Sequence, residues 1–171
     1  MDILQQCADL GVKSVLFTWG EPTLFKGLPQ LIEKASELDL YPIINTNGSM
    51  LDYETLKTLK NAGLEYIHMS LPAIDEQLFG KSTHFPKNLH RIKEAVANMK
   101  KLDYFVRVKM VLIPDNLKDV GNVIDFCAKN GVDEIHLAQF IITSSGRNSF
   151  KYVPSEDELK KVCEVVLEKK E

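Results

Sequence analysis

The chain alternates between two patterns of apolar residues, one with helical spacing and one made of short, β-branched runs. Apolar residues that recur every three or four positions predict amphipathic helices, and short apolar runs bounded by turn residues predict strands. Ser155, with Glu158 three residues later, adds a capping-box signal at the start of the last helix. The predicted helices cover residues 1–11, 27–39, 52–63, 86–103, 117–131 and 155–170, and the predicted strands cover 12–18, 41–46, 64–70, 104–113 and 132–140.

Three helix-to-strand junctions resemble one another: CADLGVKSVLFT, LKNAGLEYIHMS and CAKNGVDEIHLA. Each places a glycine (Gly11, Gly63 or Gly131) where a left-handed residue ends a helix shortly before a strand. Helices that alternate with apolar strands predict an α/β fold with a parallel sheet covered by helices. The sheet is either a doubly wound layer or part of a (β/α) barrel, and in both the chemistry belongs at the carboxyl ends of the strands. Nothing in the composition divides the chain, so we expect residues 1–171 to form a single domain.

Charge and composition narrow the class of partner. The net charge of −3 over 171 residues gives no electrostatic case for a nucleic-acid or membrane-surface binder. The chain lacks the basic start and apolar block of a signal peptide, and no apolar run approaches the ~20 residues of a membrane span. Cys7, Cys127 and Cys163 stand too far apart for a zinc or disulfide pattern, which indicates buried free thiols in a reducing compartment. We therefore expect a cytoplasmic protein whose partner is a small molecule.

Polar residues gather just after the predicted strands. Arg107 and Lys109 lie two positions apart within one strand and so share a face. If that face is the interior of a barrel, both cations must be paired or solvated, which would make them ligand contacts. The candidate site residues at the strand ends are Gly20, Glu21, Pro22, Thr46, Asn47, Ser70, Arg107, Lys109, His136, Gln139 and Arg147.

Each of these signals also has a plainer interpretation. A Thr-Asn-Gly segment after a strand is commonly only a turn. Arg107 and Lys109 would equally suit a solvent-facing edge. His68 and His136 suit the core or rim of a sheet, and the segment SSGRN suits a polar turn as well as an anion site. Their shared position at one end of one sheet is what favours function, and the pattern identifies neither a catalytic side chain nor a metal ligand.

Taken in order, the segments resemble the radical S-adenosylmethionine (SAM) superfamily, whose core is a partial (β/α) barrel of typically six units. TWGEPTL resembles its Gly-Gly-Glu-Pro motif, with Trp19 in place of the first glycine, and INTNGSML resembles its strand-end Thr-Asn-Gly. IHMSLPAID resembles the Ser-Leu-Asp-Gly stretch, VKMVLIPDNLKDV the next strand and its loop, and AQFIITSSGRN the Gly-Arg loop after the sixth strand. The match covers nearly the whole chain, and it implies a partial barrel with five parallel strands here and the first strand missing.

The resemblance also implies site roles. In this family the backbone carbonyls of the Gly-Glu-Pro segment bind the methionyl amino group of SAM, and the glutamate holds the loop in shape. By position, Thr46 and Asn47 would lie near the cofactor, and Ser70 would suit its ribose or carboxylate. The remaining implied roles are Arg107 or Lys109 for the carboxylate, Ile113 and Pro114 near the adenine, and His136, Gln139 and Arg147 for the substrate.

One family feature is absent from the sequence. The family holds a 4Fe-4S cluster on a Cys-x-x-x-Cys-x-x-Cys loop, whereas Cys7 stands alone on a predicted helix. The resemblance therefore implies an enzyme whose complete form cleaves SAM reductively and abstracts hydrogen from a substrate, with this chain inactive unless an amino-terminal segment supplies the cluster. The alternative is a non-catalytic binding module or a decayed remnant. The bulky Trp19 favours decay, because it would crowd the methionine site where the family has glycine. In either case the missing strand predicts an open sheet edge, which an amino-terminal segment or a partner chain would cover.

Overall fold

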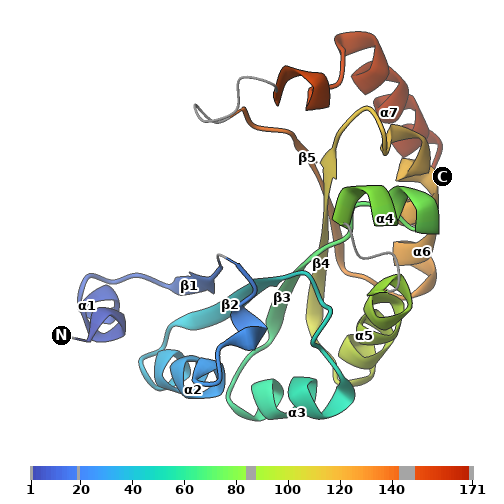
Figure 1. Ribbon diagram of the computed structural model, residues 1–171. Coiled ribbons are helices and arrows are strands. Elements are labelled where there is room, and N and C mark those ends of the chain that lie inside the picture. The colour runs from blue at the N-terminus through green and yellow to red at the C-terminus, as the bar shows by residue number, and fades with distance from the viewer. Residues whose placement is uncertain (1, 19, 84–87, 143–148, 170–171) are drawn as a thin grey trace. The chain divides into compact units, whose positions relative to one another are not determined.

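The computed structural model describes residues 2–18, 20–83, 88–142 and 149–169 (Figure 1). The strands are β1 (Ser14–Phe17), β2 (Tyr41–Thr46), β3 (Tyr66–Ser70), β4 (Phe105–Leu112) and β5 (Glu134–Gln139). The α-helices are α1 (Ile3–Asp9), α2 (Leu28–Glu37), α3 (Tyr53–Asn61), α4 (Glu76–Thr83), α5 (Leu89–Lys101), α6 (Val120–Lys129) and α7 (Glu156–Glu168). Short 3-10 turns cover η1 (Pro22–Leu24), η3 (Leu117–Asp119) and η4 (Ser149–Tyr152).

The five strands form one sheet in the order β1-β2-β3-β4-β5, which is the order of the sequence. β1 pairs parallel to β2, with Leu16 opposite Ile43, and β2 pairs parallel to β3, with Asn45 opposite His68. A doubly wound sheet reverses its strand order at a switch point, whereas a barrel wall keeps sequence order. The predicted parallel α/β sheet is therefore confirmed, and the order selects the barrel type over the doubly wound layer.

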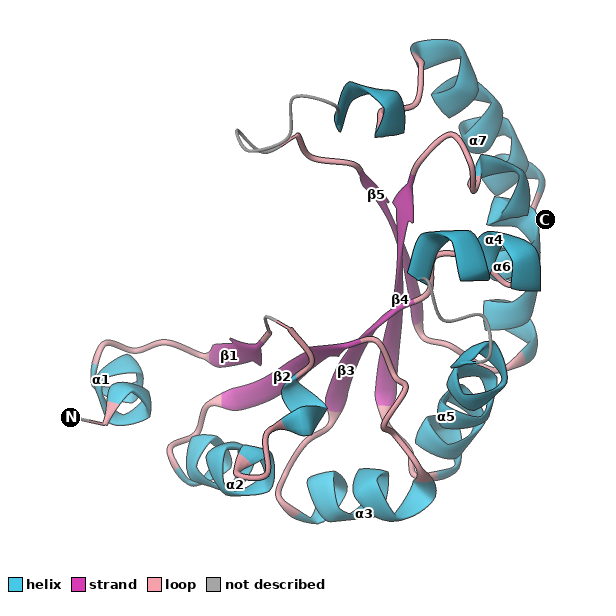
Figure 2. Ribbon diagram, in the orientation of Figure 1, coloured by secondary structure: helices cyan, strands magenta, loops and turns pink. Residues whose placement is uncertain are grey.

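The chain divides into two compact units. Unit 1 comprises Met1–Ser70 and His90–Arg107, and unit 2 comprises Leu71–Leu89 and Val108–Glu171. Within unit 1, α2 and α3 lie on one side of β2 and β3 (Figure 2).

The strands of unit 1 present two faces of different character. On the face toward the helices, Ile44, Ile67, Met69 and Val106 are fully buried and form the core together with Ile32 of α2. On the alternate positions the residues are half-buried or exposed and largely polar, from Asn45 on β2 to Arg107 on β4. Successive side chains point to opposite faces of a strand, so one alternation supplies the core and the other supplies a polar surface.

The predicted junctions and caps are confirmed. Gly11, Gly63 and Gly131 adopt φ values of +78°, +102° and +67°, the left-handed conformation that glycine reaches without a steric cost. Ser155 and Glu158 form both hydrogen bonds of a capping box at the start of α7. The sequence therefore located these helix ends correctly.

Two expectations need correction. Helix α4 was not predicted, although Asp75 caps its first turn by accepting hydrogen bonds from the amides of Gln77 and Leu78. Its internal glycine and its short length hid the helical pattern. The expectation of buried thiols holds for Cys127, but Cys7 is half-buried and Cys163, on α7, is exposed. No helix in the described part of the chain is long and apolar enough to span a bilayer.

Candidate functional site

The carboxylate of Glu21 joins the segment after β1 to the end of β2. Glu21 Oε1 accepts hydrogen bonds from the Thr23 hydroxyl and the Thr46 hydroxyl, each at 2.6 Å. Its other oxygen, Oε2, accepts from the backbone N–H of Asn47 at 2.7 Å. Both carboxylate oxygens are thus occupied by the protein itself, and the Gly20-Glu21-Pro22 turn is fixed to the Thr46-Asn47 turn.

The local sequence explains both turns. Glu21 caps the 3-10 turn η1, accepting from Thr23 N at 3.2 Å, and Pro22 stands at the first turn position, where no N–H is needed. Gly20 adopts φ +57°, and open space surrounds the position a Cβ would take. The backbone there can approach a ligand closely.

The turn after β2 is held by its own side chains. Thr46, only 2% exposed, accepts at its hydroxyl from Gly48 N at 3.0 Å, and Asn47 Oδ1 accepts from Ser49 N at 2.9 Å. Gly48 adopts φ +76°, and a Cβ there would lie 3.0 Å from Met69 Sδ. The plain interpretation of Thr-Asn-Gly as a turn is therefore correct for its geometry, and its tie to Glu21 adds a role in shaping the site.

A row of polar side chains crosses the half-buried face of unit 1. Asn45 stands opposite His68 in the β2–β3 register, and Asn45 Nδ2 donates to the Thr18 hydroxyl at 3.3 Å. Asn45 Oδ1 is the single buried side-chain polar atom that lacks a hydrogen-bond partner among the described residues. A buried acceptor left unsatisfied costs free energy, and in native structures such atoms are commonly explained by an absent ligand or water.

Arg107 continues this row on β4. The amide of Phe105 donates to Glu65 O at 2.9 Å, and the rings of Tyr66 and Phe105 lie 5.2 Å apart, so these two residues are level on one face. Two positions further on, His68 and Arg107 are therefore level as well. Both are half-buried and both make interactions within the protein. The row thus presents a hydroxyl, an amide, an imidazole and a guanidinium above an aromatic pair.

Ser70 ends β3 on the same alternation as His68 and is half-buried. On β4, Arg107 and Lys109 share the half-buried alternation, as the sequence predicted. Their partial burial sets aside the alternative of a fully solvent-facing edge for that strand.

Unit 2 contains a cleft of ≈ 640 Å³ between the ends of β4 and β5. It brings together Lys109, His136 and Gln139, three of the predicted residues. Its walls are otherwise apolar, with Val111 and Ile141 among them. Two further positions named in the sequence, Arg147 and Trp19, lie outside the described residues.

The structure also shows a polar lock in unit 2, a set of buried hydrogen bonds made by Asn116 and Asp119 that the sequence did not reveal. Asn116, 1% exposed, donates from Nδ2 to the carbonyls of Pro72 and Val111 at 3.0 and 2.9 Å and accepts at Oδ1 from Ile113 N at 3.0 Å. These bonds tie the segment after β3 to the segment after β4. Asn116 lies in the Asn-containing loop of the family pattern. Two of its backbone partners, Ile113 and Val111, are near in sequence, but the bond to Pro72 spans 44 residues and gave no local signal.

Asp119, also 1% exposed, completes this lock. Its Oδ2 accepts from the amides of Ile74 and Asp75, the latter at 2.9 Å, and its Oδ1 accepts from Asn122 Nδ2 at 2.7 Å. A carboxylate with three donors is satisfied without a countercharge. Asn116 and Asp119 therefore fix the backbone of the loop that follows Ser70, although they lie more than forty residues away in sequence.

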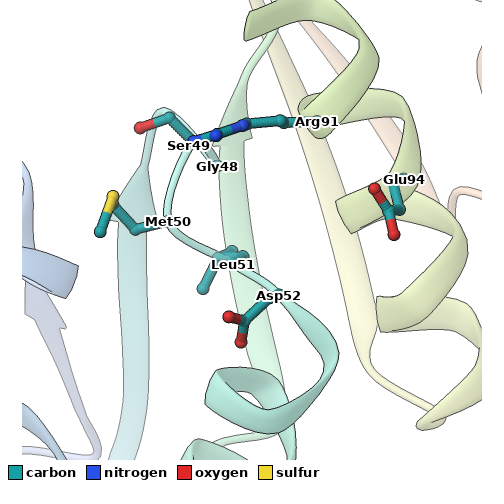
Figure 3. Close-up of a pocket in the computed structure, with 7 residues that line it drawn as sticks. All are labelled: Gly48, Ser49, Met50, Leu51, Asp52, Arg91 and Glu94. Carbon is teal, nitrogen blue, oxygen red and sulfur yellow. The ribbon is translucent and has the colours of Figure 1, made fainter.

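Unit 1 contains a cleft of ≈ 310 Å³ between the turn after β2 and α5 (Figure 3). The side chain of Arg91 extends over Gly48 and Ser49, while Asp52 and Glu94 line the lower part. Hydrogen bonds from the backbone and hydroxyl of Thr55 hold the pKa of Asp52 below its ordinary value. Two carboxylates outnumber the one guanidinium, so the lining of this cleft does not favour an anionic ligand.

The geometry suits a polar ligand such as SAM, whereas the described cysteines do not suit an iron-sulfur cluster. The open left-handed Gly20, the fixed Glu21 turn and the unsatisfied Asn45 acceptor are features of a face built to hold a polar ligand. By contrast, Cys7, Cys127 and Cys163 lie on three different helices. No group of three potential metal ligands occurs among the residues that the structure describes. No chemical step can therefore be assigned to a cluster held by these residues.

Comparison with known proteins identifies the family. The family model described as "Radical SAM superfamily" matches residues 1–127. A probable GTP 3',8-cyclase of Sulfurisphaera tokodaii is 33% identical over 159 residues, which are 90% of this chain and 49% of that protein. A PqqA peptide cyclase of Bradyrhizobium diazoefficiens is 31% identical over 137 residues, covering 80% of this chain and 36% of that protein.

Among solved structures, Streptococcus suis SuiB bound to S-adenosylmethionine matches with a TM-score of 0.77 and 22% identity. The match covers 97% of this chain and 38% of SuiB, and it confirms the predicted fold. The chain spans about half the length, or less, of the curated relatives it matches. The family model, the relatives and the fold together show that this chain belongs to the radical SAM superfamily.

Proposed function

We propose that this chain is the SAM-binding part of a radical SAM enzyme. In this proposal the backbone of Gly20-Glu21-Pro22 binds the methionyl amino group, with Thr46 and Asn47 beside it. Ser70 contacts the ribose or the carboxylate, and Arg107 or Lys109 binds the carboxylate. SuiB, whose fold this chain shares, has been solved with SAM bound, which supports the choice of cofactor.

The observation that carries the proposal is the double tie of Glu21 to Thr46 and Asn47. A loop that binds a ligand through backbone carbonyls must hold those carbonyls in place without consuming them. The Glu21 carboxylate does this, because it accepts from one hydroxyl and one amide of the neighbouring strand end. The Gly20 carbonyl accepts no hydrogen bond from the residues that the structure describes, so it remains available for a ligand ammonium group.

When bound, a 4Fe-4S cluster supplies the electron that cleaves SAM in this family. The described cysteines cannot hold such a cluster, so we propose that the complete enzyme holds it on polypeptide outside this chain. The residues of this chain would bind and orient the cofactor and exclude water from it.

We further propose that another strand covers the outer edge of β1. β1 is hydrogen-bonded only to β2 in the described sheet, and Leu16 on this strand is 49% exposed. An unpaired edge with an exposed apolar side chain favours pairing with an additional strand. That strand would come from an amino-terminal segment or from a partner chain.

Calorimetric titration of this chain with SAM, without iron, tests the binding role. We expect binding in the wild type and an affinity loss of about tenfold or more in Glu21→Gln, since the amide has only one acceptor oxygen for four donors. The matched control is Glu33→Gln, on the exposed surface of α2 in the same unit, which should bind as the wild type does. Absence of SAM binding by the wild type would refute the proposal.

Anaerobic reconstitution with iron and sulfide, followed by an assay for 5'-deoxyadenosine, tests the assignment of the cluster. We expect no cluster and no product from this chain alone, and turnover by this chain alone would contradict that assignment. The second candidate function is a non-catalytic β/α binding module, favoured by the lack of a described metal-ligand group. This second function would be selected if the chain binds SAM but forms no 5'-deoxyadenosine even when a cluster-bearing segment is added.

A further inference from the structure

The cleft of unit 2 carries a half-buried cation that has no partner among the residues the structure describes. The ammonium group of Lys109 has no hydrogen bond or ion pair in the described part of the chain, although the side chain is half-buried. A partly desolvated ammonium is costly unless an anion or a hydrogen-bond acceptor meets it. The structure provides the cation and the cleft, and leaves the acceptor to a ligand.

The other polar groups of the cleft do not supply the missing charge. His136 and Gln139 line the cleft beside Lys109, and both are neutral or cationic side chains with N–H donors. The described residues that line it include no carboxylate. The electrostatic character of the cleft therefore favours an anionic group on whatever binds there.

The walls of the cleft indicate the rest of the ligand. Val111 and Ile141 line it and are 37% and 79% exposed, so their apolar surface faces the open space. The ring of Phe140, also in the lining, lies tilted against the Tyr152 ring with 5.5 Å between their centroids, which adds an aromatic pair at the edge of the cleft. Exposed apolar side chains that gather around one opening mark a binding surface. A volume of ≈ 640 Å³ is within the range of small-molecule sites.

We infer that this cleft binds the substrate, and that the substrate is a small organic acid with a large apolar body, its anionic group on Lys109 and its apolar part against Val111 and Ile141. This inference rests on the proposed function, because it names the substrate class of the same enzyme. It also divides the two cations of β4, with Arg107 serving the cofactor carboxylate and Lys109 serving the substrate.

Two fluorescent probes with the same ring skeleton test the inference. The anionic probe is 8-anilinonaphthalene-1-sulfonate, and the uncharged probe is N-phenyl-1-naphthylamine. In Lys109→Met we expect the anionic probe to bind about tenfold or more weakly, because a charge-assisted contact is lost, while the uncharged probe binds as to the wild type. Lys118→Met, at an exposed lysine of η3 in the same unit, is the matched control and should leave both probes unchanged.

A second variant tests the same cleft in case Lys109→Met does not fold. Ile141→Ser alters a side chain that is 79% exposed, so the fold should tolerate it, and we expect both probes to bind more weakly. The inference is overturned if Lys109→Met leaves the anionic probe unaffected, or weakens both probes equally. It is also overturned if Lys109→Met abolishes SAM binding in calorimetry, since Lys109 would then serve the cofactor. Failure of the wild type to bind SAM refutes only the proposed function, because the probe titrations do not depend on SAM.

Discussion

The hydroxyl of Thr46 donates a hydrogen bond of 2.6 Å to the carboxylate of Glu21, across 25 positions of sequence. Glu21 follows β1 and Thr46 ends β2, so this single bond holds two neighbouring strand ends together. Thr46 is almost completely buried, whereas Asn47, the next residue, is exposed. The buried Thr46 hydroxyl therefore fixes the Glu21 side chain from the interior. The Gly20-Glu21-Pro22 turn remains partly exposed.

Thr46→Val tests how much this bond contributes to stability. Valine keeps the shape of threonine but removes the donor to Glu21 and the acceptor of Gly48 N–H, so the free energy of unfolding should fall by about 1–2 kcal/mol. Urea denaturation measures this loss. Thr58→Val, at an exposed position of α3, should change stability by less than about 0.5 kcal/mol. Equal losses in the two variants would contradict the role of the buried bond.

Gly20→Ala separates backbone strain from ligand contact. Gly20 and Gly11 both adopt left-handed φ, and neither has an atom within 4 Å of the position of a Cβ. Alanine at either position should therefore cost about 1–2 kcal/mol of stability through strain alone. Only Gly20→Ala should also weaken SAM binding in calorimetry, because only that Cβ would meet the proposed ligand. If Gly11→Ala weakens SAM binding as much, the Gly20 turn is not the contact.

Asp119→Asn tests the polar lock of unit 2. The buried amide has one acceptor oxygen in place of two, and its NH2 group lies where the amides of Ile74 and Asp75 or the Asn122 side chain donate. We expect a loss of about 2–3 kcal/mol in stability. Hydrogen exchange should accelerate at the Ile74 and Asp75 amides. Asp115→Asn, at an exposed position of the preceding loop, is the control, and unchanged exchange in Asp119→Asn would refute the lock.

Because the Cys127 thiol is buried, we expect the free energy of unfolding to fall at alkaline pH. Burial raises the pKa of this thiol from 9.0 to about 12, so the folded state keeps its proton while the unfolded state loses it. The stabilisation is complete below pH 9 and is lost as pH rises from there toward 12, with a slope approaching about 1.4 kcal/mol per pH unit for this one proton. Denaturation at pH 8 to 11 should show a smaller alkaline loss in Cys127→Ala. The exposed Cys163→Ala should retain the full alkaline loss, and identical profiles in all three proteins would contradict the assignment.

The sequence by itself determined the features that depend on neighbours along the chain. Gly11, Gly63 and Gly131 end helices because the left-handed conformation is a local preference, and Ser155 caps α7 because its partner is three residues away. The succession of helices and strands along the chain, and the family resemblance, followed from local motifs read in order.

Only the tertiary structure decided the features that join distant segments. It placed Glu21 on Thr46, put Asn116 and Asp119 beneath the segment after Ser70, and left Asn45 with an unsatisfied oxygen. It also set the register that brings His68 level with Arg107, and gathered Lys109 and His136 in one cleft. Each of these contacts depends on strand register and on loops packing across tens of residues, and such distances leave no periodic or spacing signal in the chain.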